Sequence, residues 1–98
     1  MVVRRVETGL LVPPPVVLER LEETFSKYPF EPSPEYRRAM LNRLTLSYYH
    51  PGTHVAYRET DEGPEVVALM GDLKEFFAEA TEEETQDVIL RRTEDWYE

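Results

Sequence analysis

The chain begins with an alternating pattern of apolar and polar residues. The apolar residues that share one side of residues 2 to 12 are Val2, Val6, Leu10 and Val12. This period of two predicts a half-buried strand, with a bulge or a break at Gly9. Three prolines follow. They end the strand, and the last one, Pro15, can occupy the first turn of a helix, where its missing N–H costs nothing.

Two segments then show the helical period of three to four residues. In the first segment the apolar face consists of Leu18, Leu21, Phe25 and Tyr28. In the second it consists of Tyr36, Met40, Leu44 and Tyr48, with Leu41 beside them. The residues 30–32 between the two segments indicate an extended connector. Because Ser33 and Pro34 suit the cap and the first position of the second helix, we expect two antiparallel helices.

Alternation returns after Pro51 and Gly52, and it predicts a β-hairpin. The strands are expected at residues 54–59 and 65–70, joined by a loop of about five residues that contains Gly63. The second strand is apolar on both faces, which favours a central position in a sheet.

A third helix is expected after the hairpin. Its apolar residues at helical spacing are Leu73, Phe76, Phe77 and Ala80. Asp72 with Glu75, and then Thr81 with Glu84, have the spacing of a capping box. The triplet 88–90 is either a last strand or the end of a helix, and its β-branched residues favour the strand.

These elements predict an α+β fold for residues 1–98, taken as one compact domain because two cores would each be too small. The expected order is β-α-α-β-β-α-β. We expect a small mixed sheet of three to four strands, with two to three helices packed on one face. The last strand is expected to pair in parallel with a hairpin strand through a helical crossover.

Composition narrows the class of protein. The chain has no cysteine, and no apolar run approaches the roughly 20 residues that cross a bilayer, so no membrane span is expected. The first residues lack the pattern of a secretory signal, and a cytoplasmic location fits best. Arginine outnumbers lysine nine to two, and Asn42 and Gln86 are the only side-chain amides. This usage is typical of a thermophilic prokaryote, although GC-rich coding also enriches arginine.

The net charge of −9 comes from the second half of the chain. Residues 50–98 hold fourteen acidic residues against four Lys and Arg, whereas the first half is nearly balanced. Such a charge repels the phosphates of nucleic acids, and it favours a partner with a basic surface.

The two histidines, His50 and His54, are the first candidates for chemistry. Their spacing suits zinc on a helix, but Pro51 and Gly52 prevent that helix, and no spacing specifies a third ligand. Packing in a turn is therefore the preferred interpretation, with a metal or catalytic role or a pH-sensitive surface as alternatives. The serines lie in or before helices without a nucleophile motif, and the glycines are too scattered for a phosphate loop. We expect no cofactor, no metal and no enzyme.

Two groups of residues point outward. Glu75, Glu79, Glu82 and Glu83 form a negative ridge on or after the third helix, either a solvated face or a docking surface for a basic partner. Trp96 and Tyr97 lie near the end of the chain, and aromatic residues of this kind either pack on the chain itself or anchor a subunit contact. A homodimer is expected from the second alternative.

Residues 6–18, VETGLLVPPPVVL, resemble the strand, glycine, apolar run and proline that open swapped-hairpin DNA-binding domains of the AbrB and MazE type. The segment departs from them in having only three residues between Gly9 and Pro13, and in being followed by helices. The resemblance implies, as an alternative, an antitoxin-type regulator that binds DNA through its N-terminal segment. The preferred hypothesis is a small non-enzymatic interaction or regulatory protein with an acidic docking surface.

Overall fold

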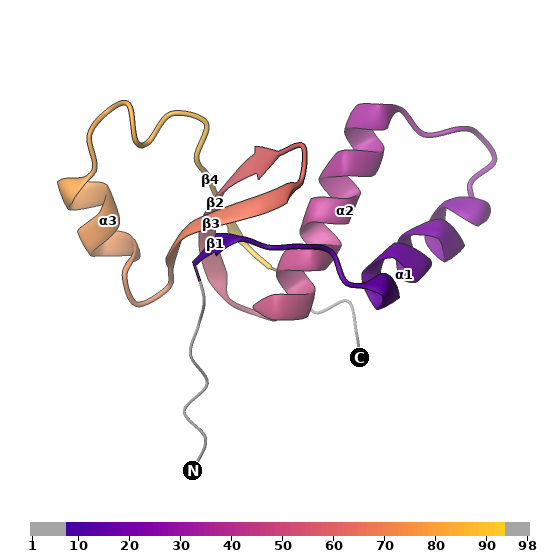
Figure 1. Ribbon diagram of the computed structural model, residues 1–98, viewed down its shortest axis with the longest axis horizontal. Helices are drawn as coiled ribbons and strands as arrows, with labels where there is room; N and C mark the ends of the chain where they lie inside the picture. The colour runs from indigo at the N-terminus through magenta and orange to yellow at the C-terminus, as the bar shows by residue number, and fades with distance from the viewer. Residues whose placement is uncertain (1–7, 94–98) are drawn as a thin grey trace, which may run out of the picture.

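A computed structural model describes residues 8–93 of the chain, and it confirms the α+β class and the predicted order of elements. The elements are β1 (Gly9–Leu10), α1 (Pro15–Ser26), α2 (Pro34–Tyr49), β2 (His54–Thr60), β3 (Gly63–Leu69), α3 (Leu73–Glu79) and β4 (Ile89–Arg92) (Figure 1). The expectation of a strand at residues 2 to 7 lies outside the described residues.

The four strands form one sheet in the order β1-β3-β2-β4, and every neighbouring pair is antiparallel. The expectation of a mixed sheet with a parallel last strand is therefore wrong. The reason lies at the other edge of β3, where Gly9 pairs with Val66 and places β1. Only the edge of β2 is left for β4, and Tyr57 pairs there with Ile89. Because β4 runs in the direction of β3, it is antiparallel to β2.

The predicted hairpin is present, but its turn is shorter than expected. Thr60 pairs with Gly63, so only Asp61 and Glu62 lie between the strands. Gly63 has a φ of 138°, which favours glycine, and a side chain there would collide with the backbone carbonyl of Leu11. The glycine thus belongs to the strand, and the segment that directly follows β1 passes close against it. The central position predicted for β3 is confirmed, since it lies between β1 and β2.

The buried apolar residues form two clusters, and α2 contributes to both. The cluster between the helices contains Val17, Leu21, Phe25, Met40 and Leu44. The cluster at the sheet contains Leu11, Leu46, Val55, Tyr57, Val66 and Leu69. Because α2 is covered on both sides, its apolar positions do not form the single stripe that the sequence suggested. Tyr36 and Tyr48, which were expected in that stripe, are exposed.

The starts of the first two helices follow the sequence closely. Helix α1 begins at Pro15, and α2 begins at Pro34 after Ser33, whose hydroxyl accepts a hydrogen bond of 3.1 Å from the Tyr36 N–H. The face of α1 differs, because Val17 is buried and Leu18 is half exposed. Residues 17, 21 and 25 are each four apart, and this row faces α2.

Helix α3 has only seven residues, and none of them is buried. Its expected capping box is absent, because the Asp72 side chain makes no capping hydrogen bond. The second predicted pair is present, and the Glu84 N–H donates to the Thr81 hydroxyl over 3.2 Å. Helix α3 and the turns that follow it lie at the end of the molecule opposite α1 (Figure 1). Within residues 8–93, no helix is long and apolar enough to cross a bilayer.

Candidate functional site

The four acidic residues predicted to bind a partner are all exposed. Glu75 and Glu79 lie on α3, and Glu82 and Glu83 lie in the turns after it. None of the four forms an ion pair within residues 8–93. Carboxylates elsewhere do, as shown by the Glu22–Arg37 pair at 2.6 Å and others. In the described part of the chain, these residues form a negatively charged surface without ion pairs, which we call the α3 ridge.

The two histidines occupy different environments. His50 is buried at the end of α2, where its backbone N–H donates to the Leu46 carbonyl over 2.8 Å. His54 is exposed in β2, opposite Arg92 of β4. No group of three His, Asp or Glu side chains that could hold a metal ion occurs in the described part of the chain. Trp96 and Tyr97, the expected subunit contact, lie outside the described residues, and that contact stays a prediction.

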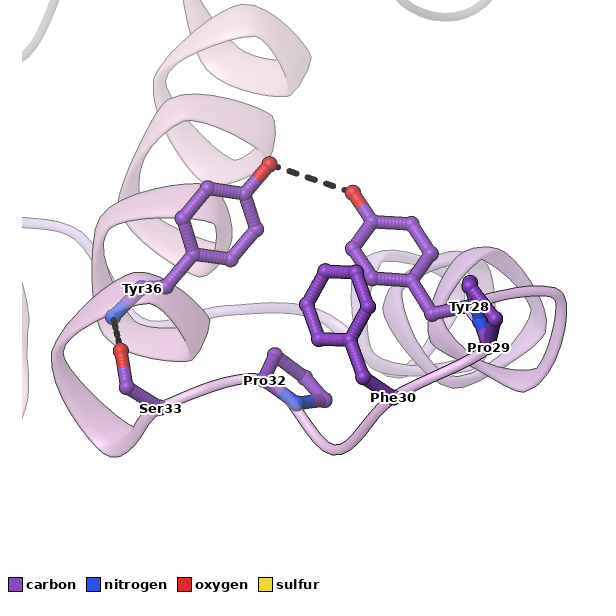
Figure 2. A pocket seen from close by; sticks show the side chains of 6 residues that line it. All are labelled: Tyr28, Pro29, Phe30, Pro32, Ser33 and Tyr36. Atoms are coloured by element: carbon purple, nitrogen blue, oxygen red, sulfur yellow. Dashed lines mark hydrogen bonds between the residues drawn. The ribbon is translucent and has the colours of Figure 1, made fainter.

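A feature that the sequence reasoning missed is a cavity of about 610 Å³ where α1 connects to α2. We call it the aromatic–proline pocket. Its lining residues, all drawn in Figure 2, are Tyr28, Pro29, Phe30, Pro32, Ser33 and Tyr36. Three aromatic rings and two prolines in one small cavity give it a predominantly apolar wall. The signal in the sequence was a proline-rich connector with a tyrosine on each side of it.

Local sequence explains how the pocket is built. Pro29 follows the last turn of α1, and the capping by Ser33 fixes the first turn of α2 next to the buried Pro32. Because the two helices are antiparallel neighbours, the end of α1 and the start of α2 meet. Their tyrosines therefore converge, and the phenolic oxygens of Tyr28 and Tyr36 are 3.1 Å apart in a hydrogen bond (Figure 2).

The ring of Tyr28 contacts the two other rings of the pocket. The centroid of Tyr28 is 5.5 Å from that of Phe30 and 6.3 Å from that of Tyr36. Phe30 is nevertheless 64% exposed, so this arrangement leaves most of a phenylalanine in water. An exposed aromatic group beside an apolar cavity is typical of surfaces that bind another molecule.

Near the pocket, the described basic residue Arg37 is paired, whereas two glutamates form no ion pair within residues 8–93. The Arg37 guanidinium lies 4.9 Å from the centre of the Phe25 ring and 2.6 Å from a Glu22 oxygen, so it is occupied. Glu31 and Glu35 are exposed, and neither forms an ion pair within residues 8–93. The hydrogen bond with Tyr36, together with burial, raises the pKa of Tyr28.

Comparison of the chain with protein-family models, with curated proteins and with solved structures gives no match. The resemblance of residues 6–18 to the AbrB and MazE type therefore stays a prediction. In its described part, this segment forms the short β1, the proline run and the first turn of α1.

Proposed function

We propose that this protein is a non-enzymatic interaction or regulatory protein that docks a basic protein partner on the α3 ridge. The observation that supports the proposal is the absence of ion pairs at all four of its exposed carboxylates within the described residues. Like charges one turn apart, at Glu75 and Glu79, cost a few tenths of a kcal/mol. A lysine or arginine supplied by a partner would turn this repulsion into attraction.

The apolar side of α3 supports the same proposal. Phe77 is 43% exposed, although the spacing of the sequence places it on the apolar face of its helix. Protein interfaces combine a buried aromatic anchor with a polar rim, and α3 offers both kinds of residue on one short element. A partner that covers Phe77 would bring its basic residues close to the carboxylates.

The test is a double charge reversal of this protein, Glu75→Lys with Glu79→Lys, whose association is measured with a partner captured by the wild-type protein. Glu19→Lys with Glu23→Lys on α1 is the matched control, because these exposed residues have the same spacing and the same effect on net charge. We expect the α3 variant to associate about tenfold more slowly and to lose salt dependence, because rim charges act mainly on the association rate. Unfolding free energies should stay within about 0.5 kcal/mol of wild type.

Equal effects of the two double variants would contradict the proposal, because they would show that net charge and not the α3 ridge attracts the partner. If the protein instead binds duplex DNA tightly in fluorescence anisotropy, the antitoxin-type alternative replaces it. A cytoplasmic location belongs to the same proposal, and the absence of cysteine supports it.

We also propose that the protein forms a homodimer in which Trp96 and Tyr97 take part, because such residues are favoured anchors of subunit contacts. Sedimentation should then give the mass of a dimer for the full chain and the mass of a monomer after truncation at Asp95. Circular dichroism of the truncated chain controls for folding. A full chain that sediments as a monomer at high micromolar concentration would contradict this proposal.

A further inference from the structure

We propose that the aromatic–proline pocket binds an extended, proline-containing segment of another protein that carries arginine or lysine next to its prolines. The site is formed by the connector that follows α1 and by the start of α2, and it is separate from the α3 ridge at the other end of the molecule (Figure 1). It therefore goes beyond the docking surface proposed above.

The lining of the pocket selects for proline. Aromatic-lined grooves bind polyproline II segments because a proline ring is apolar and the segment loses little conformational entropy when it binds. The pocket offers the rings of Tyr28, Phe30 and Tyr36, and the exposed Phe30 would gain the cover that the chain itself does not provide (Figure 2). Its volume of about 610 Å³ falls in the range of ordinary ligand sites.

The two tyrosine hydroxyls supply the polar contact. A polyproline II backbone has no internal hydrogen bonds, so its carbonyl groups need donors from the surface that binds them. In the pair Tyr28–Tyr36, one hydroxyl donates to the other. The accepting hydroxyl keeps its own proton, which is free to donate to a carbonyl of the bound segment.

Charge complementarity indicates that the bound segment carries a basic residue. Glu31 lies in the connector between the lining residues Phe30 and Pro32, and Glu35 lies in the first turn of α2. Both carboxylates are exposed and without an ion pair in the described part of the chain, whereas Arg37 is held by Glu22. An arginine or lysine that flanks the prolines would therefore find a partner, and an acidic flank would be repelled.

The experiment uses the full chain and three fluorescent peptides of about ten residues, long enough for a polyproline II segment. The first has a proline-rich centre flanked by arginine. The second replaces the prolines by alanine and keeps the arginines, and the third keeps the prolines and replaces the arginines by glutamate. Anisotropy titrations should show the tightest binding for the first peptide, with a dissociation constant about tenfold higher for each of the others.

Variants of the protein localise the binding. Phe30→Ala should weaken binding of the first peptide about tenfold, as expected for loss of an interface anchor. The control Leu90→Ala, at an exposed apolar residue of β4 outside both proposed docking surfaces, should leave binding unchanged. Because Phe30 is largely exposed, its replacement should preserve the fold, which circular dichroism checks. Tyr28→Phe combined with Tyr36→Phe keeps both rings and removes both hydroxyls, and it should weaken binding about fivefold.

Three results would overturn the proposal. These are no binding of the first peptide, equal binding of the alanine peptide, and equal effects of Phe30→Ala and Leu90→Ala. Equal binding of the alanine peptide would show that the site recognises charge without proline. None of these results depends on the charge reversals at Glu75 and Glu79, so failure here is distinct from failure of the α3 ridge.

Discussion

The hydroxyl of Thr93 donates a hydrogen bond to the backbone carbonyl of His50, and this bond joins the end of β4 to the end of α2. The same oxygen accepts a bond of 3.1 Å from the Thr53 N–H, and the Thr93 N–H donates to the Thr53 carbonyl over 2.9 Å. β4 has only four residues, none of them fully buried. A single buried threonine therefore connects the last strand to the turn that follows the long helix.

Thr93→Val should lower the free energy of unfolding by about 1–2 kcal/mol, because valine keeps the shape but leaves the His50 carbonyl and the Thr53 N–H without this partner. Urea unfolding monitored by circular dichroism measures the change. Thr85→Val is the control, since the hydroxyl of Thr85 donates to the nearby Glu82 carbonyl in an exposed turn. Similar losses in both variants would show that the Thr93 contact has no special weight.

Gly63→Ala should destabilise the protein by more than about 1 kcal/mol, because the position combines a positive φ with the close approach of the Leu11 carbonyl. Gly71→Ala is a matched control. That glycine has no positive φ, and a side chain there meets nothing within 4 Å. Thermal unfolding should therefore separate the two variants, and similar melting temperatures would contradict the tight passage of β1 over β3.

Patterns local in the sequence predicted local structure well. Ser33 followed by Pro34 marks the start of α2, and Pro15 marks the start of α1, because capping and proline geometry act within one turn. The pairing of β4 could not be predicted in this way. It depends on which sheet edge remains free once β1 has paired with β3, and strand alternation carries no information about that.

The candidate site was predictable only in part. The α3 ridge follows from charges on one short helix and in the turns after it, and the exposure of Glu75 and Glu79 agrees with the expectation. The aromatic–proline pocket was not predicted from the sequence. Tyr28 and Tyr36 matched the apolar periods of the two predicted helices, so both were expected in the core. Tyr28, just after α1, is instead only partly buried beside the cluster between the helices, and Tyr36, in the first turn of α2, is exposed. A periodicity cannot show how far along a helix the neighbouring elements cover its apolar face.

Asn42→Leu should stabilise the protein. This residue of α2 is 1% exposed, and neither atom of its side-chain amide has a hydrogen-bond partner within the described residues. A buried polar group without a partner costs about 1–3 kcal/mol, so an apolar residue of similar size should raise the free energy of unfolding by a comparable amount. A cavity of about 280 Å³, lined by Asn42 with Leu21, Leu41 and the β2–β3 turn, gives the new side chain room to adjust.

Thermal unfolding of Asn42→Leu and of Asn42→Ala separates the effect of removing the amide from the effect of changing the packing. Alanine also removes the amide but opens a space, so its melting temperature should lie well below that of the leucine variant. If Asn42→Leu melts below the wild-type protein, the amide makes a hydrogen bond that stabilises the fold, and the prediction is wrong.

The buried Tyr57 should make the free energy of unfolding fall at alkaline pH. The residue is 1% exposed in β2, and burial raises its pKa, an effect that the nearby Arg91 partly opposes. An unfolded tyrosine loses its proton near a pH of about 10, while the folded chain still holds it, so the unfolded state then binds fewer protons. The stabilising contribution is therefore fully present below about pH 10 and is lost as the pH rises through the folded pKa, by up to about 1.4 kcal/mol per pH unit.

Urea unfolding of Tyr57→Phe should show a shallower alkaline loss of stability than wild type, whereas Tyr48→Phe, on the exposed end of α2, should follow wild type. Parallel pH profiles for Tyr57→Phe and wild type would mean that other groups cause the alkaline loss.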